Sequence, residues 1–142
     1  MAFLLVSGLT GCVALGGRPV LDALTPAEHL KLGVSYEHGG EPDLALCEYE
    51  RASIGPEASA ALTCQGNIYS ARHDLFAAEA KYRAALAVDT NNLFALNNLA
   101  WLLAHQAGSL AEAEQLIRHA LDLKPEPRAA YEDTLQTILS MK

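Results

Sequence analysis

The sequence repeats itself with a period near 34 residues, and this periodicity limits the possible folds more than any other feature of the chain. A small residue recurs at Gly33, Gly66 and Ala100, at intervals of 33 and 34 residues. Each is followed, at distances that match except for one extra residue in the third repeat, by a bulky residue, an alanine, a second bulky residue and a second alanine: Tyr36, Ala45, Tyr49 and Ala52; Tyr69, Ala78, Tyr82 and Ala85; Leu103, Ala113, Ile117 and Ala120. A repeat of this length buries its apolar face only by stacking on its neighbours. The pattern therefore predicts a stack of helical units.

This pattern, G-x-x-Y followed by A-x-x-x-F-x-x-A, resembles the tetratricopeptide repeat (TPR), a helix-turn-helix unit. The resemblance extends from Pro26 to about Lys142. It implies an all-α fold, an α-solenoid of three TPR repeats plus a C-terminal capping helix, with the TPR domain over residues 25–142. The repeats are expected at about 26–58, 59–92 and 93–127, and the capping helix at about 128–141. Within the repeats we expect helices over 26–38, 42–53, 58–71, 75–88, 92–106 and 110–123.

Capping and turn residues fall at these expected helix ends. Thr25 and Glu28 have the spacing of a capping box, and Ser109 and Glu112 repeat it. Three glycines mark turns from the first to the second helix of a repeat: Gly39, Gly40 and Gly108. His73 stands at a loop position where TPR proteins often have glycine.

The first twelve residues differ from the rest, because they form an apolar run that closes with small residues and Cys12. Leu9-Thr10-Gly11-Cys12 resembles the lipobox of bacterial lipoproteins. The resemblance implies that residues 1–12 are a signal segment whose cysteine becomes the acylated N-terminus. Val13 in place of aspartate implies an outer-membrane lipoprotein that faces the periplasm of a Gram-negative cell. Residues 13–24 show no helical period and are expected to form a flexible tether.

This segment departs from a complete lipoprotein signal, because no Lys or Arg precedes the apolar run. A translation start upstream of Met1 would account for the departure. Two alternatives remain open at this point. One is an uncleaved apolar tail with a chance cysteine, and the other is a cytoplasmic TPR adaptor with a wrongly assigned start.

Charge and composition argue against several classes of function. Seventeen acidic residues against ten Lys and Arg give a net charge of −7, which repels phosphate backbones, so we expect no nucleic-acid partner. The five histidines share no metal-binding spacing, and no Gly-rich phosphate loop or GxSxG motif is present. We therefore expect no enzyme activity, no metal, no cofactor and no small-molecule substrate. Cys47 and Cys64 lie on helices that are expected to be neighbours. Two alternatives are open for them: a disulfide bond between the two, or two separate thiols.

In TPR proteins the first helix of each repeat lines a concave groove, and the resemblance implies that this groove binds a protein or peptide partner. The register assigns ten residues to it: Leu30, Val34, Glu37, Thr63, Asn67, Ser70, Phe94, Asn97, Trp101 and His105. Asn67 and Asn97 suit hydrogen bonds to a partner's main chain, and Trp101 suits a side-chain anchor. The alternatives left open are that both asparagines are ordinary polar residues of a helix surface and that Trp101 packs against the C-terminal helix.

Chaperone-binding TPR domains hold a carboxylate with Lys, Arg and Asn. The corresponding positions here are Leu30, Val34 and Thr63, which disfavours that ligand. The sequence thus predicts a lipid-anchored scaffold, held on the membrane through acylated Cys12, that helps to assemble a pilus, secretin, outer-membrane or cell-wall complex.

Overall fold

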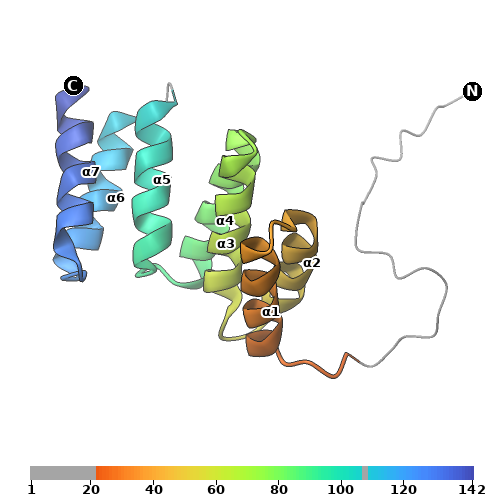
Figure 1. Cartoon of the computed structure of the whole chain (residues 1–142). Coiled ribbons are helices and arrows are strands. Elements are labelled where there is room, and N and C mark those ends of the chain that lie inside the picture. Colours follow the sequence, from red (N-terminus) through yellow and green to blue (C-terminus); the bar gives the residue numbers. More distant parts are fainter. Residues whose placement is uncertain (1–21, 107–108) are drawn as a thin grey trace, which may run out of the picture.

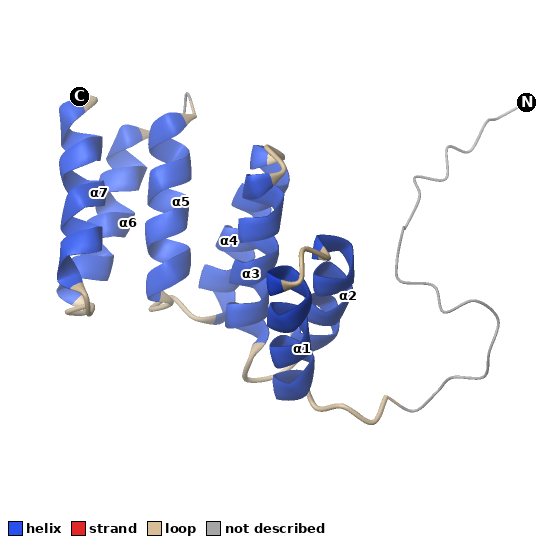
Figure 2. Cartoon of the chain, viewed as in Figure 1, coloured by secondary structure: helices blue, strands red, loops and turns tan. Residues whose placement is uncertain are grey.

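The computed structural model describes residues 22–106 and 109–142, which form seven α-helices and no strand (Figures 1 and 2). The helices are α1 (Pro26–His38), α2 (Pro42–Ala52), α3 (Ala58–Ala71), α4 (Leu75–Val88), α5 (Leu93–His105), α6 (Leu110–Asp122) and α7 (Arg128–Ser140). Each expected helix is present, and its ends lie within one residue of their expected positions. The expectation of an all-α fold is confirmed.

The helices form three hairpins, α1–α2, α3–α4 and α5–α6, which stack in chain order (Figure 1). Contacts within a hairpin are more extensive than contacts between hairpins. The last helix, α7, packs against α6 and also reaches α5. A stack of similar hairpins whose main contacts join neighbours in the chain is an α-solenoid.

In each of the first two hairpins, the two helices approach closely at a point where a tyrosine ring of one helix lies over a glycine of the other. A Cβ added to Gly33 would lie 2.6 Å from Cδ1 of Tyr49, and a Cβ added to Gly66 would lie 2.6 Å from Cδ1 of Tyr82. Both distances are shorter than real Cβ contacts, so only glycine leaves room for the ring. In the third hairpin Ala100 and Ile117 hold the matching positions, and both are fully buried.

The alanines of the repeat pattern lie where helices pack most closely. All six alanines that the pattern assigns to second helices are fully inaccessible to solvent: Ala45, Ala52, Ala78, Ala85, Ala113 and Ala120. They belong to a core in which one cluster of buried residues joins α2 to α3 and a larger cluster extends from α4 to α7. Tyr131 and Ile138 of α7 belong to the larger cluster, so α7 covers the end of the stack as expected.

Local signals explain the helix ends. Thr25 accepts a hydrogen bond from the Glu28 amide while the Glu28 carboxylate accepts one from the Thr25 amide, which completes the expected capping box. Ser109 likewise accepts from the Glu112 amide. In the turn after α3, His73 has φ = 59°, a left-handed conformation that favours glycine.

The predicted signal segment, its lipobox Cys12, Gly108 and all of the predicted tether before Asp22 lie outside the described residues. None of the helices in the described ranges combines the length and hydropathy that a membrane-spanning helix requires.

Where the described chain begins, it is held by a buried histidine. His29 of α1 is 3% exposed, and its Nδ1 lies 2.6 Å from a Glu48 carboxylate oxygen on α2. Its Nε2 lies 3.0 Å from the Asp22 carboxylate. Arg51 pairs with Glu48 at 3.1 Å and so adds a positive charge to the same cluster. This cluster fixes the residues that lead into α1 against the first hairpin.

Candidate functional site

The helices α1, α3 and α5 share one face of the array, and two adjoining hollows lie on it. The first, the apolar hollow, has a volume of about 340 Å³ and is lined by Leu30, Val34, Ala60, Thr63, Cys64, Asn67, Asn92 and Phe94. The second, the amide hollow, has a volume of about 440 Å³ and is lined by Asn67, Ser70, Ala71, Tyr82, Asn97, Asn98 and Trp101. Asn67 lines both, so the two hollows adjoin at this residue, and together they are called the groove below.

The walls of the apolar hollow are mainly hydrocarbon, and most of their polar groups already form hydrogen bonds within the protein. Phe94 is 72% exposed and Val34 is 38% exposed. The Thr63 hydroxyl donates to the Ser59 carbonyl and accepts from the Asn92 amide, so both polar groups are already satisfied. Burial raises the pKa of the Cys64 thiol, which therefore stays protonated at neutral pH. The neutral thiol adds a weakly polar group to the lining of the hollow.

The amide hollow is organised around the carbonyl oxygen of Asn67. This oxygen accepts a hydrogen bond from the Tyr82 hydroxyl at 2.9 Å and another from the Asn98 amide at 2.8 Å. Burial raises the pKa of Tyr82 to about 12, so its hydroxyl remains a donor at physiological pH. Trp101, 48% exposed, stacks on His105 with ring centroids 4.0 Å apart.

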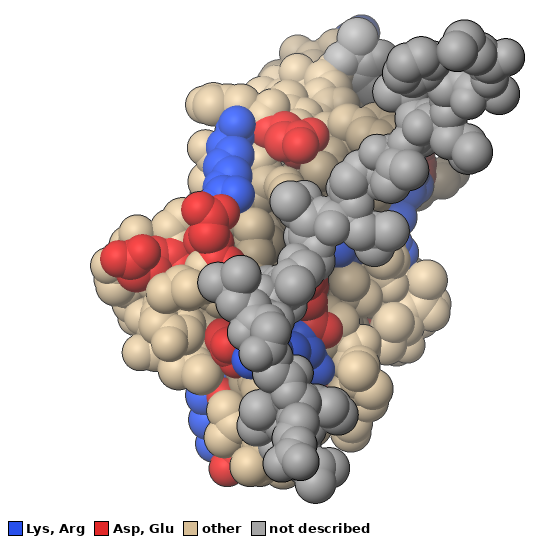
Figure 3. Space-filling model, turned by 90° about the vertical axis from the view of Figure 1, so that its right-hand side faces the viewer, with Lys and Arg blue, Asp and Glu red and all other residues tan. Residues whose placement is uncertain are grey.

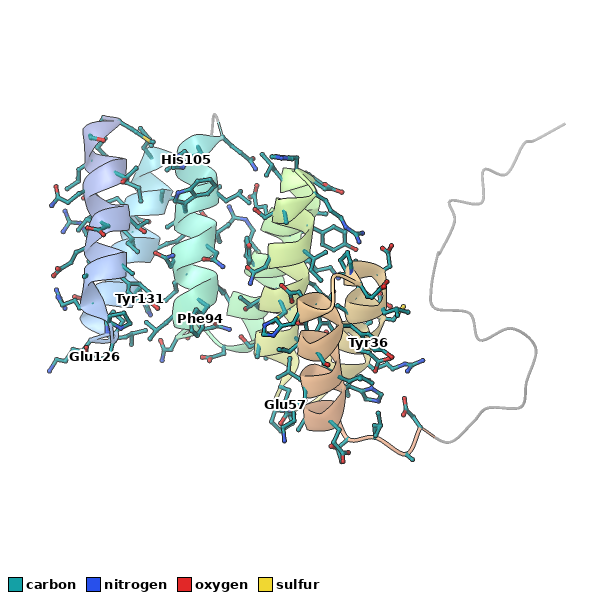
Figure 4. The ribbon with its side chains drawn as sticks, in the orientation of Figure 1. Tyr36, Glu57, Phe94, His105, Glu126 and Tyr131 are labelled. Carbon is teal, nitrogen blue, oxygen red and sulfur yellow. The ribbon has the colours of Figure 1, made fainter. Side chains whose placement is uncertain are left out.

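Eight of the ten residues assigned to the groove from the sequence line one of the two hollows: Leu30, Val34, Thr63, Asn67, Ser70, Phe94, Asn97 and Trp101. The other two lie beside it. Glu37 accepts a hydrogen bond from the Tyr49 hydroxyl at 2.7 Å, and His105 supports the Trp101 ring from the far end of α5 (Figure 4). Phe94 marks the opposite end of that helix.

The structure also bears on the alternatives for Trp101 and Asn97. The indole lies half in solvent and lines the amide hollow, so it is not buried against α7. Asn97 lines the same hollow, but its carbonyl oxygen accepts from the Thr134 hydroxyl of α7 at 2.9 Å. Part of its hydrogen-bonding capacity is therefore used within the array.

Sequence reasoning missed six lining residues: Ala60, Cys64, Ala71, Tyr82, Asn92 and Asn98. Helical spacing could have found Asn98, because it lies four residues after Phe94 and three before Trp101 and so shares their face. Tyr82 had no such signal. It reaches the groove from a second helix, across the space that Gly66 leaves open.

Among residues 22–106 and 109–142, no group of three or more His, Cys, Asp or Glu side chains is arranged to hold a metal ion. Cys64 is a free thiol, so the disulfide considered between Cys47 and Cys64 is not formed. Seen from the side of α1 and α2, acidic and basic side chains are interspersed on the visible part of the described surface (Figure 3).

Comparison with known proteins gives one informative similarity. No protein-family profile matches the chain. The chain is 29% identical over 150 aligned positions to the type IV pilus assembly protein PilF of Pseudomonas aeruginosa. The alignment covers all of this chain and 59% of PilF, so the chain spans less than two thirds of that protein's length.

Proposed function

We propose that this protein is a TPR scaffold that binds a protein partner in its groove during assembly of a cell-envelope complex, with the type IV pilus as the first candidate. The similarity to a type IV pilus assembly protein along the whole chain carries this proposal. The stacked hairpins, their period near 34 residues and the small residues at each hairpin crossing support the assignment to the TPR class. Binding, rather than catalysis, is the function that a groove of amide and apolar side chains suits.

The protein is further proposed to be an outer-membrane lipoprotein facing the periplasm, anchored through acylated Cys12. The lipobox-like sequence supports this part of the proposal. Several acyl chains hold a protein on a membrane, because each buried methylene contributes about 0.8 kcal/mol. Mass spectrometry of the protein from the membrane fraction should find acylated Cys12 as the N-terminus.

We expect Cys12→Ser to release the protein from the membrane fraction, because this substitution removes the acylation site. Fractionation of cells that produce the parent or the variant checks this outcome. Cys64→Ser serves as the control, because it changes a thiol that lies inside the array. A Cys12→Ser protein that stays with the membrane contradicts the anchor, and an unmodified N-terminus in the cytoplasm supports the cytoplasmic adaptor instead.

We expect Trp101→Ala to weaken partner binding by roughly thirtyfold, because truncating an aromatic anchor commonly costs about 2 kcal/mol. The partner is captured by cross-linking in cells, and the amount recovered with each variant is measured beside the number of surface pili. Phe76→Ala is the matched control, since Phe76 is 86% exposed and lines neither hollow. Equal recovery and piliation with the Trp101 and Phe76 variants would overturn the groove as the binding site.

A helical melt that collapses in Trp101→Ala would show that the indole stabilises the fold. In that event Ala71→Phe tests the same hollow, because Ala71 is an exposed lining residue whose replacement fills the hollow without removing a core contact.

A further inference from the structure

The buried histidine of the first hairpin has a carboxylate at each of its ring nitrogens. Nδ1 of His29 lies 2.6 Å from the Glu48 carboxylate of α2, and Nε2 lies 3.0 Å from the Asp22 carboxylate before α1. A neutral imidazole carries one N–H and donates to only one of these acceptors, whereas an imidazolium donates to both. The geometry therefore matches a doubly protonated His29 while Asp22 is in place.

The charged groups around the ring come from three parts of the chain. Five side chains face or adjoin it: Asp22 of the chain before α1, Glu48 and Arg51 of α2, and Glu28 and Lys31 of α1 itself. The next helix, α3, carries no acidic or basic residue. Glu28 is occupied by the capping box, and Arg51 pairs with Glu48. The two hydrogen bonds that depend on the protons of His29 are thus those to Asp22 and Glu48.

These two hydrogen bonds differ in what can replace them when His29 loses a proton. The Glu48 side chain is 10% exposed, whereas the Asp22 side chain is 47% exposed. Water hydrates an exposed carboxylate, but a buried carboxylate that loses a donor stays poorly solvated. The remaining proton of a neutral His29 therefore belongs on Nδ1, toward Glu48, and the hydrogen bond to Asp22 is the one that is lost.

Few other contacts hold residues 22–24, called the lead-in segment below, against the first hairpin. Leu24 is exposed, and Arg51 Nε lies 3.9 Å from the Asp22 carboxylate, an exposed and weak ion pair. A hollow of about 240 Å³ lies between the segment and the hairpin, lined by Asp22, Leu24, Pro26, His29, Arg51 and Ile54. The attachment of the segment thus depends mainly on the Asp22–His29 pair.

We infer that this pair is a pH-dependent switch, in which the His29 imidazolium holds the lead-in segment on the first hairpin and loss of the Nε2 proton releases it. The attachment is complete at low pH and is lost as the pH rises through the titration of His29. Release ends at Thr25, which the capping box holds. It adds three residues, or about 10 Å when extended, to the free chain before the array. This inference goes beyond the proposed function and depends on neither the groove nor the anchor.

Nuclear magnetic resonance of the full chain in detergent micelles tests the inference. Proton–nitrogen spectra of the imidazole ring distinguish the imidazolium from each neutral tautomer. Between about pH 5 and pH 8, where histidine ordinarily titrates, we expect His29 to change from the imidazolium to the tautomer protonated on Nδ1. Backbone order parameters of the lead-in segment, measured from carbon relaxation at Cα, should fall over the same range from about 0.85 to below about 0.6.

Three results would overturn the inference. The first is a His29 that keeps one protonation state over the whole range, and the second is a neutral ring protonated on Nε2. The third is a lead-in segment whose order parameters do not change while His29 titrates.

Two variants assign the effect to the Asp22–His29 pair. Asp22→Ala removes an exposed carboxylate that precedes α1, so the helices should form while the lead-in segment has low order parameters at both ends of the pH range. The matched control is Asp43→Ala, which removes the carboxylate of another ion pair of the first hairpin, that with Arg72. Its lead-in segment should show the same pH dependence as the parent. A lead-in segment that stays ordered in Asp22→Ala, or equal behaviour of the two variants, would show that the pair does not hold the segment.

Discussion

At the scale of single residues, the size of one side chain in each hairpin is matched to the size of its partner. Gly33 lies under the Tyr49 ring and Gly66 under the Tyr82 ring, while the third hairpin pairs Ala100 with the smaller Ile117. A larger residue on one helix is thus accompanied by a smaller one on the other. This match decides how closely the two helices of a hairpin approach, and hence where Tyr82 places its hydroxyl in the groove.

We expect Gly66→Ala to lower the free energy of unfolding, although alanine normally stabilises a helix interior relative to glycine by about 1 kcal/mol. The added methyl group meets the Tyr82 ring, and such overpacking typically costs about 1–3 kcal/mol. Urea unfolding followed by circular dichroism measures the change. Gly39→Ala is the control, because its nearest neighbours would lie at 3.4 Å, an ordinary contact distance.

The double variant Gly66→Ala, Tyr82→Ile reproduces the pair found in the third hairpin. Its loss of stability should be smaller than the sum of the two single losses, because removing the ring makes room for the methyl group. A Gly66→Ala protein as stable as the parent would show that the glycine is not required for the ring.

At the scale of helices, ion pairs connect neighbouring hairpins. Contacts between hairpins are less extensive than contacts between the two helices of one hairpin. Arg83 of α4 pairs with Glu112 of α6 at 2.7 Å and with Glu79 of its own helix at 2.8 Å. Arg72 pairs with Asp43 and so joins the second hairpin to the first. These side chains are all at least partly exposed, and each pair adds only a small stabilisation.

The Arg83–Glu112 pair predicts a specific pH dependence. The Arg83 guanidinium lowers the pKa of Glu112 in the folded protein. The stabilisation is therefore complete above the ordinary carboxyl range and is lost as the pH falls through the lowered pKa. In Glu112→Gln we expect a lower Tm at pH 7 and a difference from the parent that shrinks toward zero on acidification.

Thermal melts between pH 7 and pH 3 at low salt measure this difference. Glu50→Gln is the control, because Glu50 is exposed and belongs to no ion pair found between described residues. A Tm difference between Glu112→Gln and the parent that is constant with pH would contradict the role of the charge.

The helices were predictable from the sequence because their determinants are local. A capping box, a proline or a glycine acts within a few residues, and the small residues that repeat every 33 or 34 positions give the order of the hairpins. The groove was predictable only for side chains on the first helices, where spacing along one helix decides the face. Tyr82, Asn92 and the Thr134 bond to Asn97 depend on distances between separate helices, which no local pattern encodes.

At the scale of the whole molecule, the two core clusters divide the array unequally. The smaller cluster joins α2 to α3, and the larger extends from α4 to α7. In a solenoid, stability is approximately a sum over units and the interfaces between them. Damage to the larger cluster should therefore affect α5, α6 and α7 more than it affects α1 and α2.

We expect Ile138→Ala to cost about 2–5 kcal/mol, because it removes a fully buried side chain of α7 from the larger cluster. Hydrogen exchange should show lost protection in α5–α7 while the first hairpin keeps most of its own. Leu139→Ala is the matched control, at an exposed position on the same helix. Uniform loss of protection along the chain would show that the array unfolds as one cooperative unit.

The ion pair of Asp22 with His29 determines how a mechanical load enters the array from its N-terminal side. Asp22 precedes α1, yet it is held 3.0 Å from a histidine whose other ring nitrogen contacts Glu48 on α2. Tension on the chain before Asp22 is thus shared between α1 and α2 before the first turn of α1 is strained. A load applied there therefore enters the first hairpin through both of its helices.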